Sequence, residues 1–195
     1  MKTIRISIAA LLLTATTALP SAAQRISRNK AWREVAKREA RQLRAERQSA
    51  DSIEHLKAAD ALARGEFVLE ADRLRLKHGE EGTVGSTTNF VALHDGMATI
   101  QVSPSYSGGG PNGVGGITVE GAVSGIERSI DKQGAHHLTM NVSGTGVSAQ
   151  VAINLSAGNA GASATIIPNF NSFTMTLIGR IVPFAESTVF KGRAL

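Results

Sequence analysis

The sequence contains no cysteine among its 195 residues. A disulfide framework, a thiolate nucleophile, a zinc–thiolate or iron–sulfur centre and a lipid-anchored cysteine are therefore excluded. Aromatic residues are also scarce, with six Phe, one Tyr and one Trp. No run approaches the roughly 20 apolar residues of a membrane helix, so we expect no transmembrane segment.

The first 23 residues have the composition of a cleavable secretory signal. Lys2 and Arg5 form a short basic region, an apolar run follows over residues 6–14, and the small residues Ser21, Ala22 and Ala23 precede Gln24. This order is typical of a leader that is removed on export. We therefore expect a periplasmic or secreted protein that is not lipid-anchored.

Residues 24–64 form a basic arm with helical periodicity. Residues 25–64 hold 11 Lys and Arg against 6 Asp and Glu, whereas residues 65–195 hold 8 against 10, so the positive charge of the chain lies in the arm. Apolar residues recur at helical spacing from Trp32 to Leu43, and the pattern breaks at residues 46–48. Asp51 with Glu54 resembles a capping box, which predicts a second helix over residues 51–64.

The arginines of the arm allow two interpretations. They could bind an anionic surface, such as lipid phosphates or an acidic polysaccharide, or they could simply form a solvated helix face. Export argues against nucleic acid as a partner.

From residue 65 to residue 183 the pattern changes to the two-residue alternation of β-strands. Residues 89–93 and 97–102 flank His94, Asp95 and Gly96, which predicts a tight hairpin. Further alternating segments are residues 67–76, 117–130, 138–142, 147–155, 162–166 and 173–181. The connections are too short for parallel crossovers, so the sheet should be antiparallel with neighbouring strands paired in sequence order. We expect residues 184–195, after the last predicted strand, to form a C-terminal tail.

The alternation changes parity at two positions, near Asp72 and at Gly125. A regular strand cannot change the face of its side chains, so we expect a bulge or bend at each position. These features predict an all-β fold: a curled antiparallel meander, lipocalin-like, forming a barrel or half-barrel with the arm at its N-terminus. An outer-membrane barrel is disfavoured, because the outward positions are polar and aromatic girdles are missing.

Several segments of this region resemble a secreted bacterial family known as domain of unknown function 4251. The segments are GEFVLEADRL (65–74), STTNFVAL (86–93), GPNGVGGITVEG (110–121), SGTGV (143–147) and PNF (168–170). The resemblance covers roughly residues 61–183 and implies an exported protein of Gram-negative, Bacteroides-like bacteria with a curled antiparallel sheet. It implies no activity for any residue, and the arm before Ala58 lies outside it.

The motifs of common catalytic and metal sites are missing. There is no HExxH motif and no Gly-x-Ser-x-Gly elbow, and the glycine-rich loop over residues 108–116 lacks the ending of a P-loop. His136 and His137 are adjacent in a strand and point to opposite faces, so they cannot share one metal ion. We therefore expect no catalytic residue, no metal and no cofactor.

The remaining interpretation is a non-catalytic binding or interaction module of the cell envelope. A hollow sheet could hold a small apolar or glycan ligand, with Met140 and Met175 in its lining. Alternatively, an envelope protein could bind the loop rim through Tyr106, Asn112, Asn169 and Phe170. A secreted hydrolase with an unrecognised site, or an outer-membrane-associated structural protein, would also be compatible with this pattern.

Overall fold

The computed structural model describes residues 22–103, 116–144, 147–169 and 174–192. The chain divides into two compact units, Met1–Ala45 and Glu46–Leu195. The first unit contains the N-terminal part of helix α1 (Ala22–Arg64), and the second contains its C-terminal part and the whole β-sheet. Within the described residues, no helix combines the length and the apolar character needed to cross a membrane.

Helix α1 is continuous, so the predicted break at residues 46–48 and the separate helix starting at Asp51 are wrong. The segment has no proline or glycine and is rich in Ala and Arg, which are strong helix formers. High propensity along the whole segment therefore carries the helix through the position where its apolar periodicity stops.

The helix ends at a glycine whose backbone is left-handed. Gly65 has φ +73°, its N–H donates to the Leu62 carbonyl at 3.3 Å, and the Glu66 N–H donates to the Ala61 carbonyl at 3.0 Å. This pair of hydrogen bonds is the Schellman motif, which favours glycine at the left-handed position. The motif reverses the chain directly into the first strand.

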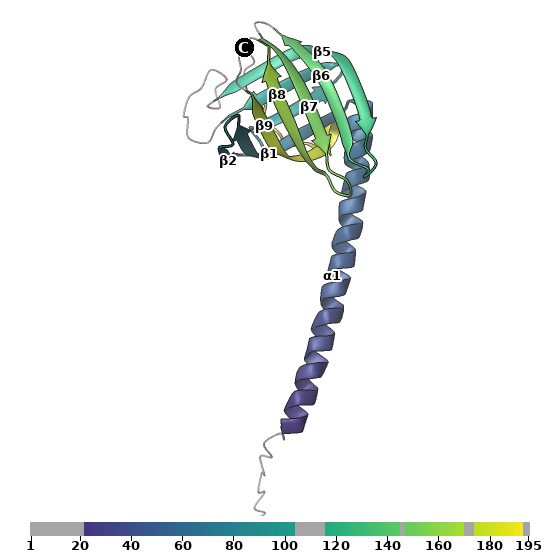
Figure 1. Cartoon of the computed structure of the whole chain (residues 1–195). Coiled ribbons are helices and arrows are strands. Elements are labelled where there is room, and N and C mark those ends of the chain that lie inside the picture. The colour runs from purple at the N-terminus through teal and green to yellow at the C-terminus, as the bar shows by residue number, and fades with distance from the viewer. Residues whose placement is uncertain (1–21, 104–115, 145–146, 170–173, 193–195) are drawn as a thin grey trace, which may run out of the picture. The chain divides into compact units, whose positions relative to one another are not determined.

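Nine strands follow within the described residues, in a single antiparallel sheet (Figure 1). They are β1 (Phe67–Leu76), β2 (Glu81–Thr83), β3 (Phe90–His94), β4 (Met97–Val102), β5 (Ile117–Ile130), β6 (His136–Gly144), β7 (Val147–Leu155), β8 (Gly161–Pro168) and β9 (Met175–Pro183). Strands β1 and β9 pair along their whole length, which closes eight of the strands into a barrel and leaves β2 as an extra strand beside β1. The all-β antiparallel fold is confirmed, and the sheet is a closed barrel rather than a half-barrel.

Both predicted irregularities are present. The β1–β9 register shifts between Ala71 and Arg73, and the β5–β6 register shifts between Ser124 and Glu127. Gly125 adopts φ +60° within the second shift, which is the conformation of a glycine bulge. These bulges strengthen the local twist that barrel closure needs.

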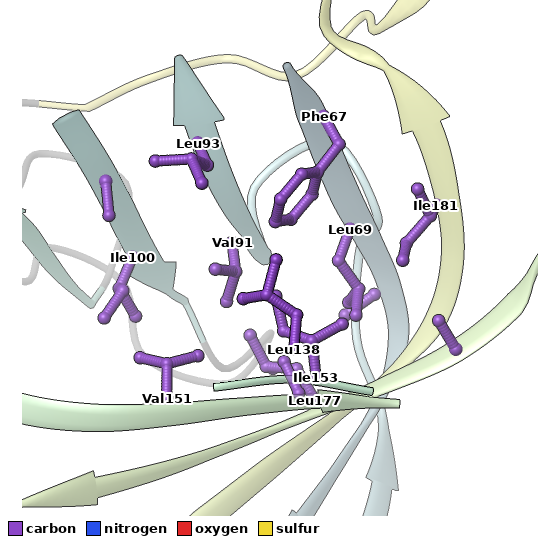
Figure 2. Packing of buried hydrophobic residues seen from close by; sticks show 14 of the residues in the cluster. Phe67, Leu69, Val91, Leu93, Ile100, Leu138, Val151, Ile153, Leu177 and Ile181 are labelled. Carbon is purple, nitrogen blue, oxygen red and sulfur yellow. The ribbon is translucent and has the colours of Figure 1, made fainter. Parts of the chain in front are cut away.

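Apolar side chains fill the inside of the barrel (Figure 2). Phe67 and Leu69 of β1 meet Leu138, Ile153 and side chains of the remaining barrel strands in one buried cluster. Ala58, Ala61 and Leu62 of α1 belong to the same cluster, so the last turns of the helix close one end of the barrel. An eight-stranded barrel is just narrow enough for side chains to fill its interior, which is the situation here.

The C-terminal tail binds the outer face of the barrel. After the short 3₁₀ helix η1 (Phe184–Glu186), Val189 packs on a second small cluster made by Val68, Phe90 and Ala92. Gln101 is fully buried, and its amide donates to the carbonyls of Thr88 at 3.0 Å and Phe190 at 2.8 Å. Buried side-chain hydrogen bonds to the backbone therefore fix the tail.

Candidate functional site

Met140 and Met175, the predicted lining of a ligand cavity, lie in or against the packed core of the barrel. Met140 is 1% exposed within the core, and the half-buried Met175 packs against the same core. Two hollows on the described residues open to solvent and reach core members, Leu155 and Ala162 in one and Ala160 and Ile181 in the other. Burial of Met140 therefore leaves it no surface for a ligand.

The predicted loop rim is mostly outside the described residues. Tyr106, Asn112 and Phe170 fall there, so the structure does not test them. Asn169 is exposed, and its side-chain amide donates to the Ser148 hydroxyl at 2.5 Å. Of the three candidates that the structure does describe, Met140 lies in the core, Met175 packs against it and Asn169 is exposed.

The larger hollow, of about 320 Å³, is lined by residues of four strands. Its lining includes Arg73, Asn154, Ser163 and Ile178, which occupy successive cross-strand positions on β1, β7, β8 and β9. Asn154 already accepts a hydrogen bond from His137 at 2.6 Å. The hollow is thus a mixed depression that is open to solvent, with the core residues Leu155 and Ala162 also in its lining.

The smaller hollow, of about 150 Å³, lies between α1 and the end of β9. Lys57 of the helix and Glu186 of η1 form an ion pair at 3.1 Å beside it. Both side chains are half exposed, so the pair contributes little to stability by itself. It nevertheless fixes how the helix meets the 3₁₀ turn.

A more distinctive cluster lies at the same end of the barrel. His94 ends β3, and its Nδ1 is hydrogen-bonded to the carboxylate of Glu66, which directly follows the helix-terminating glycine. The imidazole stacks on the ring of Phe184 at 4.0 Å between centroids and 5° between planes. The Asp95 N–H donates to the second oxygen of Glu66 at 3.2 Å. Three segments distant in sequence are therefore tied together at one point.

The charges of this cluster support each other. The hydrogen bond from His94 holds the pKa of Glu66 below its usual value, and the same bond raises the pKa of His94 above its usual value. Because the pKa of His94 is higher in the folded protein than in the unfolded chain, its contribution to stability is fully present below the ordinary histidine pKa. That contribution is lost as the pH rises through the pKa of His94 in the folded protein. The pKa of Glu66 is lower in the folded protein, so its contribution to stability is present above the ordinary glutamate pKa. That contribution is lost as the pH falls through the pKa of Glu66 in the folded protein.

Glu66, His94 and Asp95 also place three potential metal ligands within 4.8 Å of one another. The geometry argues against a single cation, because Glu66 faces Nδ1 of the ring and Asp95 faces Nε2, at 3.3 Å. One ion cannot bind the opposite nitrogens of one imidazole. The arrangement is that of a histidine between two carboxylates.

Strand β5 extends far beyond its neighbour on one side. Strand β4 pairs with residues 117–122 only, and the last hydrogen bond toward the β3–β4 hairpin joins the Val123 N–H to the Gly96 carbonyl at 3.0 Å. Residues 124–130 pair with β6 alone and are all exposed, including Ile126 and Ile130 at 37% and 65%. We call residues 124–130 the free edge of β5.

The free edge is joined to the cluster through the end of α1. The Arg128 Nε–H donates to the Leu62 carbonyl at 3.4 Å, where a cation complements the negative end of the helix dipole. A Cβ on Gly65 would lie 3.5 Å from both Arg128 and Leu93. The Glu66–His94–Phe184 cluster and the free edge therefore form one continuous region, which we call the helix-end surface.

Sequence reasoning missed this surface for a clear reason. It noted His94 and Asp95 only as a hairpin tip, and no local signal connects them with Glu66 or Phe184. A signal for the free edge was present, because the alternation of residues 117–130 is much longer than that of residues 97–102.

Comparisons with known proteins agree with this fold. The family described as domain of unknown function (DUF4251) matches residues 48–181. A crystal structure of a DUF4251 family protein from Bacteroides eggerthii DSM 20697 is similar, with 43% identity and a TM-score of 0.64 over 76% of this chain and 99% of that chain. No curated protein matches. The extent of the family match and the identity to this relative show that the chain belongs to the DUF4251 family.

Proposed function

We propose that this protein is a non-catalytic interaction module that binds a protein partner on the outside of its barrel, at the helix-end surface. The observation that carries the proposal is the filled interior. Core residues from α1 and the barrel strands pack into one buried cluster, so the space that a small apolar ligand would need is occupied. A fold of this kind offers its outer surface for recognition.

The helix-end surface has the properties of such a recognition site. It combines exposed apolar side chains, Ile126, Ile130 and Phe184, with charged groups fixed by hydrogen bonds. Exposed apolar residues with a polar rim are typical of sites where proteins meet. The surrounding contacts also hold the surface in one conformation, which lowers the entropy cost of binding.

A site-specific photo-crosslinker in the native host tests this proposal. A benzophenone side chain at position 130 should form adducts with a defined partner band, whereas the same group at the exposed position Ile167 on β8 should not. Equal adducts at both positions, or none at position 130, would contradict the proposal.

We also propose that the protein is exported to the cell envelope, as the composition of residues 1–23 favours. Fractionation followed by N-terminal sequencing tests this point. The mature chain is expected in the periplasm or medium, beginning near Gln24. An intact N-terminus in the cytoplasm would be the contrary result.

The arm is proposed to bind an anionic surface. The side chains of residues 32–54 are exposed, so its arginines are accessible. Changing Arg33, Arg38, Arg41 and Arg44 to Gln should reduce co-sedimentation with anionic vesicles or an acidic polysaccharide. If sedimentation is unchanged, the arginines are only a solvated face.

A further inference from the structure

We propose that the free edge of β5 accepts an extended peptide of a different protein as an additional antiparallel strand, selected by an acidic residue opposite Arg128. This inference rests on the proposed function, because it specifies the class of partner and how that partner binds at the helix-end surface. The hydrogen-bonding directions, the exposure and the charges of residues 124–130 support it.

The hydrogen-bonding groups of the edge can be assigned from the turn that follows it. The Asp131 N–H donates to the Ala135 carbonyl at 2.9 Å, so the backbone of Asp131 faces β6. Directions alternate along an antiparallel strand, hence Ser129 and Glu127 also face β6, and Ile130 and Arg128 face away. Described residues supply no backbone partner on that side, so the edge presents the N–H and C=O groups of Arg128 and Ile130 to solvent.

An exposed row of such groups is a template for another strand. The bulge at Gly125 limits the regular part of the template to its last residues, where Ile130 is 65% exposed. An incoming strand could therefore form main-chain hydrogen bonds to Arg128 and Ile130 and cover the isoleucine side chain.

Pairing with a second copy of this chain is disfavoured by charge. If two copies of the chain paired antiparallel through this edge, a two-fold axis perpendicular to the sheet would relate them. One residue would then lie opposite its own copy, at the centre of the pairing register. In the register centred on Arg128, two arginines lie directly opposite each other, and in the register centred on Glu127, two glutamates do. Like charges in directly opposed positions destabilise a strand pair.

The two remaining symmetric registers have the same defect. Centring on Ser129 opposes Glu127 to Asp131, and centring on Ile130 opposes Arg128 to Lys132. Every symmetric pairing centred on the regular part of the edge, residues 127–130, therefore brings like charges together. A foreign strand avoids the conflict when it places an acid opposite Arg128 and a base opposite Glu127.

Synthetic peptides provide the probe. The capped peptide Thr-Val-Thr-Glu-Lys-Val-Thr, bound antiparallel, sets Glu against Arg128, Lys against Glu127 and valines against the two isoleucines. The control peptide Thr-Val-Thr-Lys-Glu-Val-Thr exchanges the two charges only. Binding to the intact protein is followed by amide chemical shifts in NMR titrations.

We expect the first peptide to bind with a Kd below about 1 mM, to shift the amides of Arg128 and Ile130, and to bind about tenfold more tightly than the control. Ile130→Pro removes an outward N–H and should abolish binding, whereas Ile130→Thr keeps that N–H and should retain it. Methylating the peptide nitrogens that face the edge should abolish binding without changing the protein.

The inference is overturned if neither peptide binds at millimolar concentration, if both bind equally, or if the shifts map elsewhere on the barrel. A crosslink at position 130 in cells together with a failed peptide titration would leave the proposed function intact and reject strand addition alone. The reverse outcome would show that the edge accepts a strand but reject its use as the partner site in the cell.

Discussion

Replacing Leu62 with Ala should measure how strongly α1 closes the barrel. The Leu62 side chain is 2% exposed and belongs to the main core cluster together with Ala58 and Ala61. Removing three buried carbons costs about 2 kcal/mol of transfer free energy at ~0.8 kcal/mol per methylene. The cavity that remains adds about 1 kcal/mol, because the surrounding barrel can only partly collapse.

The expected loss is therefore about 3 kcal/mol of unfolding free energy, or a Tm lowered by about 6–12 °C for a chain of this size. Leu56→Ala is the matched control, since Leu56 lies in the same helix and is 68% exposed, and it should cost less than about 0.5 kcal/mol. Calorimetry is the suitable assay, because Trp32 lies in the exposed arm and would not report on the core. Similar, small losses for both variants would refute docking of the helix end onto the barrel.

Two further predictions concern the cluster and the tail. NMR titration of His94 should give a pKa above the ordinary histidine value of about 6.5, and Glu66→Gln should return that pKa to the ordinary value. The ion pair should therefore stabilise the fold most between about pH 4.3 and 6.5, the ordinary pKa values of Glu and His. An unshifted His94 in the unmodified protein would show that the pair does not form in solution. Gln101→Ala should remove the amide that binds the carbonyls of Thr88 and Phe190 and cost about 1–3 kcal/mol, with faster trypsin cleavage after Lys191. Gln150→Ala, on the exposed side of β7, should change neither stability nor cleavage. Identical cleavage rates in the two variants would contradict the proposed anchoring of the tail.

Local pattern predicted much of the sheet. The parity changes near Asp72 and at Gly125 correspond to register shifts that the structure contains, since the face of a side chain is fixed residue by residue. The hairpin at residues 94–96 follows from the Asp-Gly pair, and both residues have positive φ. These features depend only on neighbouring residues.

Features that depend on distant residues could not be predicted. Closure of the barrel rests on β1 pairing with β9, more than 100 residues later in the chain, and the alternation of each strand is the same in an open sheet. The cluster of Glu66, His94 and Phe184 likewise needs three segments to meet. The apolar periodicity of the arm led to a wrong prediction of a helix break. The helix continues through the exposed residues 46–48 because their helix propensity is high.

We propose that the filled barrel leaves recognition to its outer surface, at the edge where the described residues give the backbone of Arg128 and Ile130 no partner. Amide hydrogen exchange of the free protein, resolved by residue, tests it most directly. The N–H groups of Glu127 and Ser129 should be protected by β6, whereas those of Arg128 and Ile130 should exchange much faster. Equal protection at all four amides would mean that the edge is already occupied and would contradict the account.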